Sequence, residues 1–356
     1  MSLQIFPSVN FHLLGYIFSI HLFSCKNHKK IGDKYFPLHL IIYGDFFEGI
    51  INMKNNNDNQ EVKSEESERG EEIEVDEGKL PSVAAAVHEQ IRMEGEKELE
   101  RDGMALLLSA TAAGISMGAS LMAKGIFQVN LHDVPGGFLL ENLGYTFGFI
   151  IVIMARQQLF TENTVTAVLP IMHKPSAGNI LLLMRLWGLV LLGNLIGTAL
   201  ASLAFIHLPI FDDATRSAFV NISMKVMENP PDEMFANAVV SGWIIATMVW
   251  MLPSAGAAKI WVIILMTWLV GLGDLAHIVI GSVEIFYLIF NGTIPWQDFI
   301  WPFAIPTLIG NIIGGTFIFA LISHVQIRND MRNKSRAEAK AREKRQKRQS
   351  EQKSVD

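Results

Sequence analysis

Long apolar runs separated by short polar stretches fill the middle of the chain. A helix needs about 20 apolar residues to cross a bilayer, so these runs predict six membrane-spanning helices. They cover residues 104–127, 138–160, 179–205, 234–252, 259–290 and 299–323. We therefore predict an all-α polytopic membrane domain over residues 104–323. Because the number of spans is even, both termini are expected on the same side of the membrane.

The fifth run is interrupted near its middle by Gly271-Leu272-Gly273-Asp274-Leu275-Ala276-His277. Ionisable groups at this depth are costly and usually mark a pathway or a proton relay. Non-helical backbone survives there only if it lines a cavity or is buried in protein. The interruption therefore predicts a broken helix with His277 beside the break. The alternative is a kinked helix whose histidine bonds to a neighbouring helix.

Two features recur at nearly the same spacing. The third run contains Gly-Asn-x-Ile-Gly at 193–197, and the sixth repeats it at 310–314, which is 117 positions later (310 − 193 = 117). The second run ends in a polar interruption around Thr161, 116 positions before His277 (277 − 161 = 116). Unless the match is chance, this spacing predicts a duplication of three spans, with the second copy inverted and the second and fifth helices broken. Such repeats indicate a central binding site in transport proteins.

The residues before the first span divide into three segments. In residues 1–52 an apolar patch precedes the lysines, the reverse of the order in a signal peptide, so we predict a non-native extension and a native start at Met53. The alternative is a real, weakly ordered extension. Residues 53–80 are rich in Asn, Glu and Ser, which predicts a disordered acidic tail. Residues 81–103 are predicted to form a cytoplasmic surface helix.

The C-terminal segment, residues 324–356, is strongly basic. Positive charge beside a span belongs in the cytoplasm, so both termini are predicted to be cytoplasmic. A lipid-facing or solvated helix explains this charge better than a nucleic-acid-binding tail, and no nucleic-acid partner is expected.

Composition agrees with a membrane protein and narrows the chemistry. Half of the residues (50%) are hydrophobic and the mean hydropathy is +0.30. The single cysteine, Cys25, excludes a disulfide framework and a cysteine metal site. The metalloprotease and hydrolase motifs His-Glu-x-x-His and Gly-x-Ser-x-Gly do not occur. No enzymatic activity, metal or cofactor is therefore expected.

Several of these motifs together resemble the formate/nitrite transporter family. They are Leu159-Phe160-Thr161 in the second span, Lys259 and His277 in the fifth, and Gly310–Gly315 in the sixth. The resemblance covers residues 100–325 and is closest to a divergent branch of bacterial inner-membrane proteins. It implies an aquaporin-like inverted 3+3 repeat and a homopentamer with one pore in each subunit. It also implies small monovalent anions, or their protonated acids, as cargo.

The resemblance also assigns residues to a pore. Thr161 would donate its hydroxyl to the cargo, and His277 would give it a hydrogen bond or a proton, as an imidazole can near physiological pH. Largely apolar constrictions would exclude hydrated ions; they would be formed by Tyr145, Phe149, Leu159 and Val270, for which ordinary helix packing is the alternative.

The chain departs from the family pattern at five places. Arg156-Gln157-Gln158 stands where the family has Gly-Ala-Asp, Ala276 replaces an acidic residue, and Gly281 replaces an asparagine. Val270 stands where a constriction of the family has an aromatic residue, and Phe149 where the family has a smaller apolar residue. The constrictions are therefore expected to be reshaped, so formate or nitrite cannot simply be carried over as the cargo.

Six further residues are predicted to support the pore: Asn194, Asn311, Arg156, Asp274, Glu284 and Lys259. Asn194 and Asn311 are expected to hold the broken helices through hydrogen bonds to their backbone. Arg156 would either attract anions or pair with Glu141, Glu162 or Asp274. Glu284 lies on the same helix face as His277 and would set its pKa or serve a subunit contact. Lys259 would attract anions or reach to the membrane interface.

A different class of function remains as the alternative. A non-conducting structural or regulatory membrane protein would act through its charged tails. Passage of a small weak acid, and its dependence on His277, discriminates between the two.

Overall fold

The computed structural model describes residues 28–31, 34–37, 82–131 and 133–353. The chain divides into two units, Met1–Glu72 and Ile73–Asp356. In the first, strands β1 (His28–Ile31) and β2 (Lys34–Pro37) pair antiparallel, with His28 opposite Pro37 and Ile31 opposite Lys34. Apart from these strands, the predicted extension 1–52 lies outside the described residues, as does the predicted tail 53–80.

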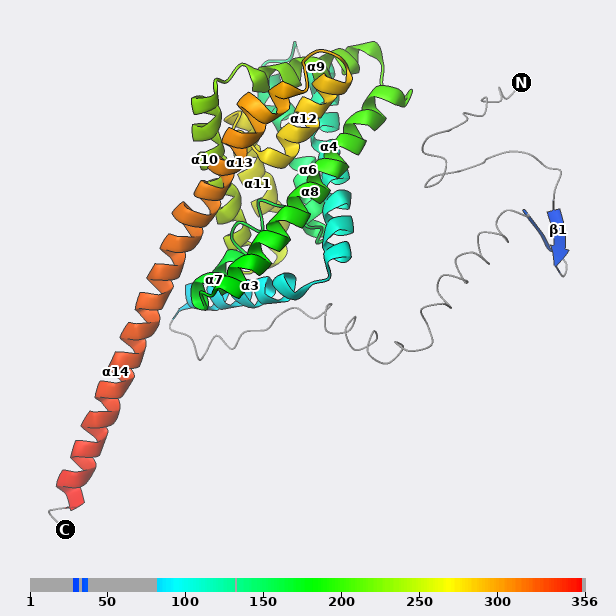
Figure 1. Cartoon of the computed structure of the whole chain (residues 1–356). Coiled ribbons are helices and arrows are strands. Elements are labelled where there is room, and N and C mark those ends of the chain that lie inside the picture. Colours follow the sequence, from blue (N-terminus) through cyan, green and yellow to red (C-terminus); the bar gives the residue numbers. More distant parts are fainter. Residues whose placement is uncertain (1–27, 32–33, 38–81, 132, 354–356) are drawn as a thin grey trace. The chain divides into compact units, whose positions relative to one another are not determined.

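The second unit, called the membrane unit here, is helical throughout its described residues (Figure 1). Among the described residues, five helical segments are long and apolar enough to cross a membrane: Gly103–Leu131, Gly137–Met154, Ala177–His207, Pro231–Met251 and Phe299–Arg345. Two shorter apolar helices are α11 (Lys259–Leu272) and α12 (Ile278–Phe290). The helical class and the multi-pass character predicted from hydropathy are thus confirmed.

The long segments correspond to labelled elements in Figure 1. They are α4 (Gly103–Leu131), α5 (Gly137–Leu143) with α6 (Thr146–Met154), α8 (Ala177–His207), α10 (Pro231–Met251), and the run η3 (Phe299–Ala304), α13 (Ile305–Ile312), η4 (Ile313–Ala320) and α14 (Leu321–Lys353). Shorter helices are α3 (Val83–Glu100), α7 (Val168–His173), α9 (Asp213–Met227) and η2 (Gly256–Ala258).

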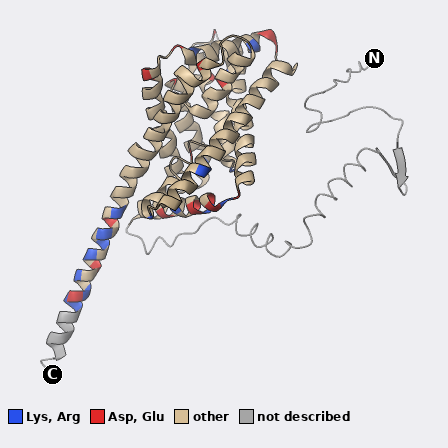
Figure 2. Ribbon diagram, viewed as in Figure 1, with Lys and Arg blue, Asp and Glu red and all other residues tan. Residues whose placement is uncertain are grey.

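Helices α3 and α7 lie at one end of the helix bundle and α9 at the other (Figure 1). We refer to these as the α3 end and the α9 end. Charged residues gather on α3, along the later part of α14 and at the α9 end, whereas the helices between the two ends of the bundle carry few charges (Figure 2). This distribution is what a bilayer core requires of the helices that cross it.

Two of the apolar segments are broken. Helix α6 ends at Met154 and helical structure resumes only at Val168, in α7. Likewise α11 ends at Leu272 and α12 begins at Ile278. A residue in the left-handed region opens each break, Arg156 with φ 51° and Asp274 with φ 46°. Non-glycine residues seldom adopt this conformation, so both mark true ends of helices rather than gentle kinks.

Glycines allow the closest helix crossings. A methyl group on Gly197 of α8 would lie 2.1 Å from the carbonyl oxygen of Thr111 in α4. A methyl group on Gly314 would lie 2.0 Å from the carbonyl oxygen of Val239 in α10. Small residues let membrane helices approach to backbone contact, where van der Waals packing is greatest. These crossings bring α8 against α4 and η4 against α10 at backbone distance.

Candidate pore site

The two breaks meet at Thr161 and His277. The Thr161 hydroxyl oxygen lies 2.8 Å from His277 Nε2, and both residues are 1% exposed. Thr161 belongs to the first break and His277 ends the second, directly before α12. The structure therefore brings together the two polar residues that the sequence spacing had paired.

His277 also caps its own helix. Its Nδ1 accepts from the backbone N–H groups of Val279 and Ile280, at 3.3 and 3.4 Å. A nitrogen that accepts carries no proton, so the neutral ring is protonated at Nε2. Nε2–H then donates to Thr161, whose own hydroxyl proton is left to be donated elsewhere.

Asn194 and Asn311 fasten the breaks. Asn194 Oδ1 accepts from the N–H of Phe160, and its Nδ2 donates to the carbonyls of Ala110 and Gln158. Asn311 Oδ1 accepts from the N–H of Ile278, and its Nδ2 donates to the carbonyls of Ala238 and Ala276. Both asparagines are fully buried.

These bonds change one detail of the expected site. In transport proteins with broken helices, half-helix N-termini point at anionic groups of the substrate at mid-membrane depth. The N–H groups of Phe160 and of Ile278, Val279 and Ile280 are instead already bonded to Asn194, Asn311 and His277. What remains at the start of α12 is the partial positive charge of a helix N-terminus.

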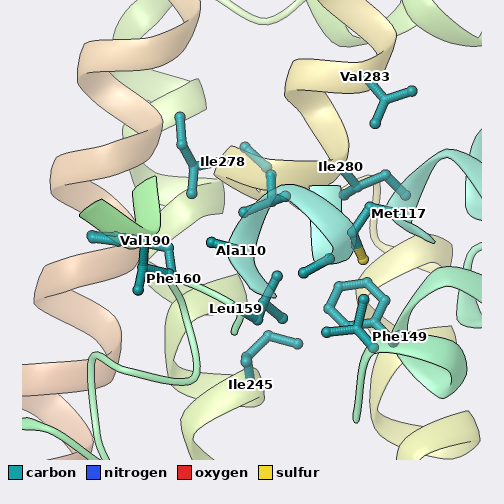
Figure 3. Close-up of a cluster of buried hydrophobic side chains, with 14 of the residues drawn as sticks. Ala110, Met117, Phe149, Leu159, Phe160, Val190, Ile245, Ile278, Ile280 and Val283 are labelled. Carbon is teal, nitrogen blue, oxygen red and sulfur yellow. The ribbon is translucent and has the colours of Figure 1, made fainter. Parts of the chain in front are cut away.

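Aromatic and aliphatic side chains surround the histidine. The Phe149 ring meets the His277 ring edge to face at 5.2 Å between centroids, and Tyr145 stacks on Phe149 at 5.5 Å. Leu159 and Val270 are also buried. Figure 3 shows Phe149 and Leu159 in an apolar cluster with Met117, on the side of α4 that faces them.

A small cavity of about 40 Å³ adjoins His277. Its polar and aromatic lining includes Lys124, Tyr145, Asp274, His277, Glu284 and Phe303. It also reaches Lys225 near the end of α9 and Asn229 just after that helix, so it lies on the α9 side of the histidine. Of the predicted site residues it gathers Tyr145, Val270, Asp274, His277 and Glu284.

Three predicted residues lie elsewhere or have other partners. Asp274 pairs with Lys225, because α9 packs against α12 and brings Lys225 to the second break; this corrects the alternative in which Asp274 pairs with Arg156. Arg156 itself is exposed. Lys259 begins α11 and does not line the cavity beside His277.

Lys124 was missed by the sequence reasoning. It is 8% exposed in α4 and lines the cavity beside His277. The signal was available, because Lys124 is the single ionisable residue in the first apolar run, 104–127, and such residues mark pathways. The same criterion had identified His277.

Polar contacts fasten α3 to the rest of the membrane unit. His88 Nε2 lies 3.0 Å from His324 Nδ1 in a buried contact, and Gln158 Nε2 of the first break donates to Glu98 Oε2 at 2.7 Å. Burial, reinforced by the neighbouring His324, lowers the pKa of His88 from 6.5 to about 4.

No cluster of three or more metal-binding side chains occurs among the described residues.

Comparison with solved structures relates this fold to known channels. A pentameric formate channel with formate bound superimposes with a TM-score of 0.55 at 22% identity, covering 62% of this chain and 95% of that one. A structure described as an FNT family ion channel gives a TM-score of 0.57 at 18% identity, covering 66% and 96%. At these identities the likeness concerns the fold alone.

Sequence comparison gives nearer relatives. The inner membrane protein YfdC of Escherichia coli (strain K12) is 73% identical over 283 residues, which are 80% of this chain and 91% of that protein. The uncharacterized transporter YrhG of Bacillus subtilis (strain 168) is 27% identical over 204 residues, 55% of this chain and 73% of that protein. The model of the formate/nitrite transporter family matches residues 85–325. The chain therefore belongs to the formate/nitrite transporter family.

Proposed function

We propose that each subunit forms a pore through which a small monovalent anion, or its conjugate weak acid, crosses the membrane. The observation that supports this most directly is the hydrogen bond between Thr161 and His277, 2.8 Å long and buried where two broken helices meet. An isolated anion cannot enter such an apolar interior without hydrogen-bond donors or a proton. This pair can supply both.

The donors form a short chain toward the cargo. His277 Nε2–H donates to the Thr161 hydroxyl. That hydroxyl in turn can donate a second hydrogen bond to an anion. Charge-assisted bonds of this kind are stronger than neutral ones, and the N-terminus of α12 adds positive potential. Proton transfer to the anion requires the cationic ring, which forms when Nδ1 takes up a proton from water and gives up its capping bonds. That ring can give its Nε2 proton to the anion and become neutral again, and the anion then continues as the neutral acid.

We further propose that the membrane unit is an inverted 3+3 repeat of six spans and assembles as a homopentamer. The equivalent bonds of Asn194 and Asn311 on the two breaks support the repeat. The pentamer is supported by the fold similarity to the pentameric formate channel. The basic charge of α14 supports a cytoplasmic α3 end and cytoplasmic termini. In this arrangement α3 lies on the cytoplasmic membrane face.

Proteoliposomes test the proposal. Swelling or internal pH is recorded after addition of formate, nitrite, acetate, lactate or hydrosulfide, with protein-free vesicles giving the background. Wild-type protein should pass one or more of these anions, and His277→Ala and His277→Asn should both reduce the flux. Thr161→Val should reduce it too, whereas Thr161→Ser, which keeps the hydroxyl, should not.

A matched control uses a histidine away from the pore. His173, exposed at the end of α7, can be changed to Ala and should conduct as wild type does. Flux that is unchanged in both His277 variants would contradict the assigned role of the histidine. Correctly assembled wild-type protein that passes none of the five anions would contradict the proposed function.

A further inference from the structure

Lys124 and Glu284 are two buried charges beside His277 that the proposed pore mechanism does not use. They are 8% and 4% exposed, and both line the cavity of about 40 Å³ on the α9 side of the histidine. Neither makes a hydrogen bond or close ion pair with another described residue. Burying a charge is costly unless it is paired, so each is available to a bound molecule.

Tyr145 adds a third free group to the same cavity. The residue is only 4% exposed, and its buried hydroxyl makes no hydrogen bond with the residues that the structure describes. Its ring lies under the Lys124 ammonium, with Nζ 5.8 Å from the centroid. Cation and hydroxyl together offer donors to an anionic group, while Glu284 offers acceptors.

This mixture of charges discriminates between anions. A carboxylate ion that binds to Lys124 and Tyr145 must also share the cavity with Glu284, and like charges repel strongly where water is scarce. A cargo that also has a hydroxyl group relieves the conflict, because it can donate a hydrogen bond to Glu284 while its carboxylate accepts from Lys124. A bare anion such as formate or nitrite has no donor for this purpose.

We infer that Lys124, Tyr145 and Glu284 form a second cargo subsite next to His277, which prefers small carboxylates that carry a hydrogen-bond donor over bare anions. The volume sets an upper size. A water needs on the order of 10–15 Å³ measured this way, so the cavity suits a molecule of a few non-hydrogen atoms. This inference rests on the proposed transport function and specifies the class of cargo.

Glycolate and acetate make a direct test, because they differ by one hydroxyl group. Their fluxes are compared in proteoliposomes containing wild type, Glu284→Gln, Glu284→Asp, Lys124→Gln or Tyr145→Phe, after size-exclusion chromatography has shown the same assembly as wild type. Wild type should pass glycolate faster than acetate. In Glu284→Gln the ratio should fall about tenfold, as expected for losing one hydrogen bond to a charged group.

The remaining variants separate the roles. Glu284→Asp keeps the charge and should keep the preference for glycolate. Lys124→Gln and Tyr145→Phe should lower both fluxes, because they remove donors to the carboxylate group that both anions share. Exposed residues provide matched controls: Glu228→Gln and Lys174→Gln should leave both fluxes unchanged.

The outcomes distinguish this inference from the function on which it rests. If wild type conducts and His277→Ala reduces the flux, but the glycolate-to-acetate ratio is the same in wild type and Glu284→Gln, the subsite is refuted and the transport function stands. Wild-type fluxes in Lys124→Gln and Tyr145→Phe would also refute it. If assembled wild-type protein passes neither these two anions nor the five above, both proposals fail.

Discussion

Asn194 and Asn311 lie 117 positions apart (311 − 194 = 117) and bond to the two breaks in the same way. Each accepts from one backbone N–H of its break, Phe160 or Ile278, at 2.9 Å. Each also donates to a carbonyl of its break and to a carbonyl of the neighbouring long helix. Non-helical backbone inside a membrane must have its polar groups bonded by protein, and these two carboxamides do that.

Replacing either asparagine should therefore destabilise the protein. Asn194→Ala leaves one N–H and two carbonyls without their side-chain partner, and each unsatisfied buried group costs about 1–3 kcal/mol. The apparent melting temperature of the detergent-solubilised protein should fall clearly, and Asn311→Ala should behave alike. Asn130→Ala removes a bond from an exposed asparagine and should have little effect. Equal melting temperatures for all three variants would contradict the role assigned to the buried pair.

Two glycines of α8 should respond oppositely to alanine. At Gly197 a methyl group meets backbone of α4 at 2.1 Å, so Gly197→Ala must push the helices apart and lower stability. A methyl group added at Gly188 would have no described atom within 4 Å, apart from the neighbouring backbone of its own helix. Gly188→Ala should be neutral or slightly stabilising, since alanine favours helix over glycine by up to about 1 kcal/mol. Thermal unfolding of the two variants side by side makes the comparison, and similar losses in both would rule out the close-crossing explanation.

The buried His88 should make stability depend on pH. Its pKa is lowered from 6.5 to about 4 in the folded protein, so in acid the unfolded chain takes up a proton before the folded one does. The stabilising contribution is complete above about pH 6.5 and is lost as the pH falls toward the lowered pKa. The melting temperature of wild type should therefore drop over this range, and that of His88→Gln should drop less.

A second histidine controls for general acid effects. His207→Gln, at the end of α8, should retain the wild-type pH dependence. Hydrogen exchange of α3 adds a local measurement, because protonation of His88 acts against its buried contact with His324. If His88→Gln loses stability with acid as steeply as wild type, the contact does not have the predicted effect.

Asp274 combines an unusual backbone conformation with an ion pair to Lys225 at a partly exposed site, with side chains 39% and 50% exposed. Exposed pairs contribute about 0–1 kcal/mol, and asparagine tolerates the left-handed region nearly as well as aspartate. Asp274→Asn should therefore cost little. Asp274→Val should cost more, because a β-branched residue is strained at φ 46°. Matching melting temperatures for the two variants would show that the backbone conformation is not a constraint here.

Hydropathy and motif spacing predicted the long helices of the membrane unit and the positions of its two breaks. Apolar run length predicted the long helices, and the polar interruptions at Thr161 and His277 coincide with the places where α6 and α11 end. The duplication spacing identified these two residues as equivalent positions of the two repeats, and the structure shows that they are in contact. Their role in transport stays a prediction.

Partners that depend on packing between distant helices could not be obtained in this way. The sequence suggested only Arg156 as a basic partner for the Asp274 carboxylate, whereas the position of α9 places Lys225 beside it. The contact of His88 with His324 joins residues 236 positions apart without a repeated motif. Lys124 lies in a continuous apolar run, so no polar interruption marks its position in the way that the breaks mark Thr161 and His277.

The capping bond of His277 gives the site a direction. With Nδ1 turned to the backbone of α12, only one edge of the imidazole is open to exchange with another molecule, and Thr161 stands at that edge. A cargo can therefore bond to the ring from one direction only. The first turn of α12 fixes this direction in the protein without cargo, because it holds the imidazole in one orientation.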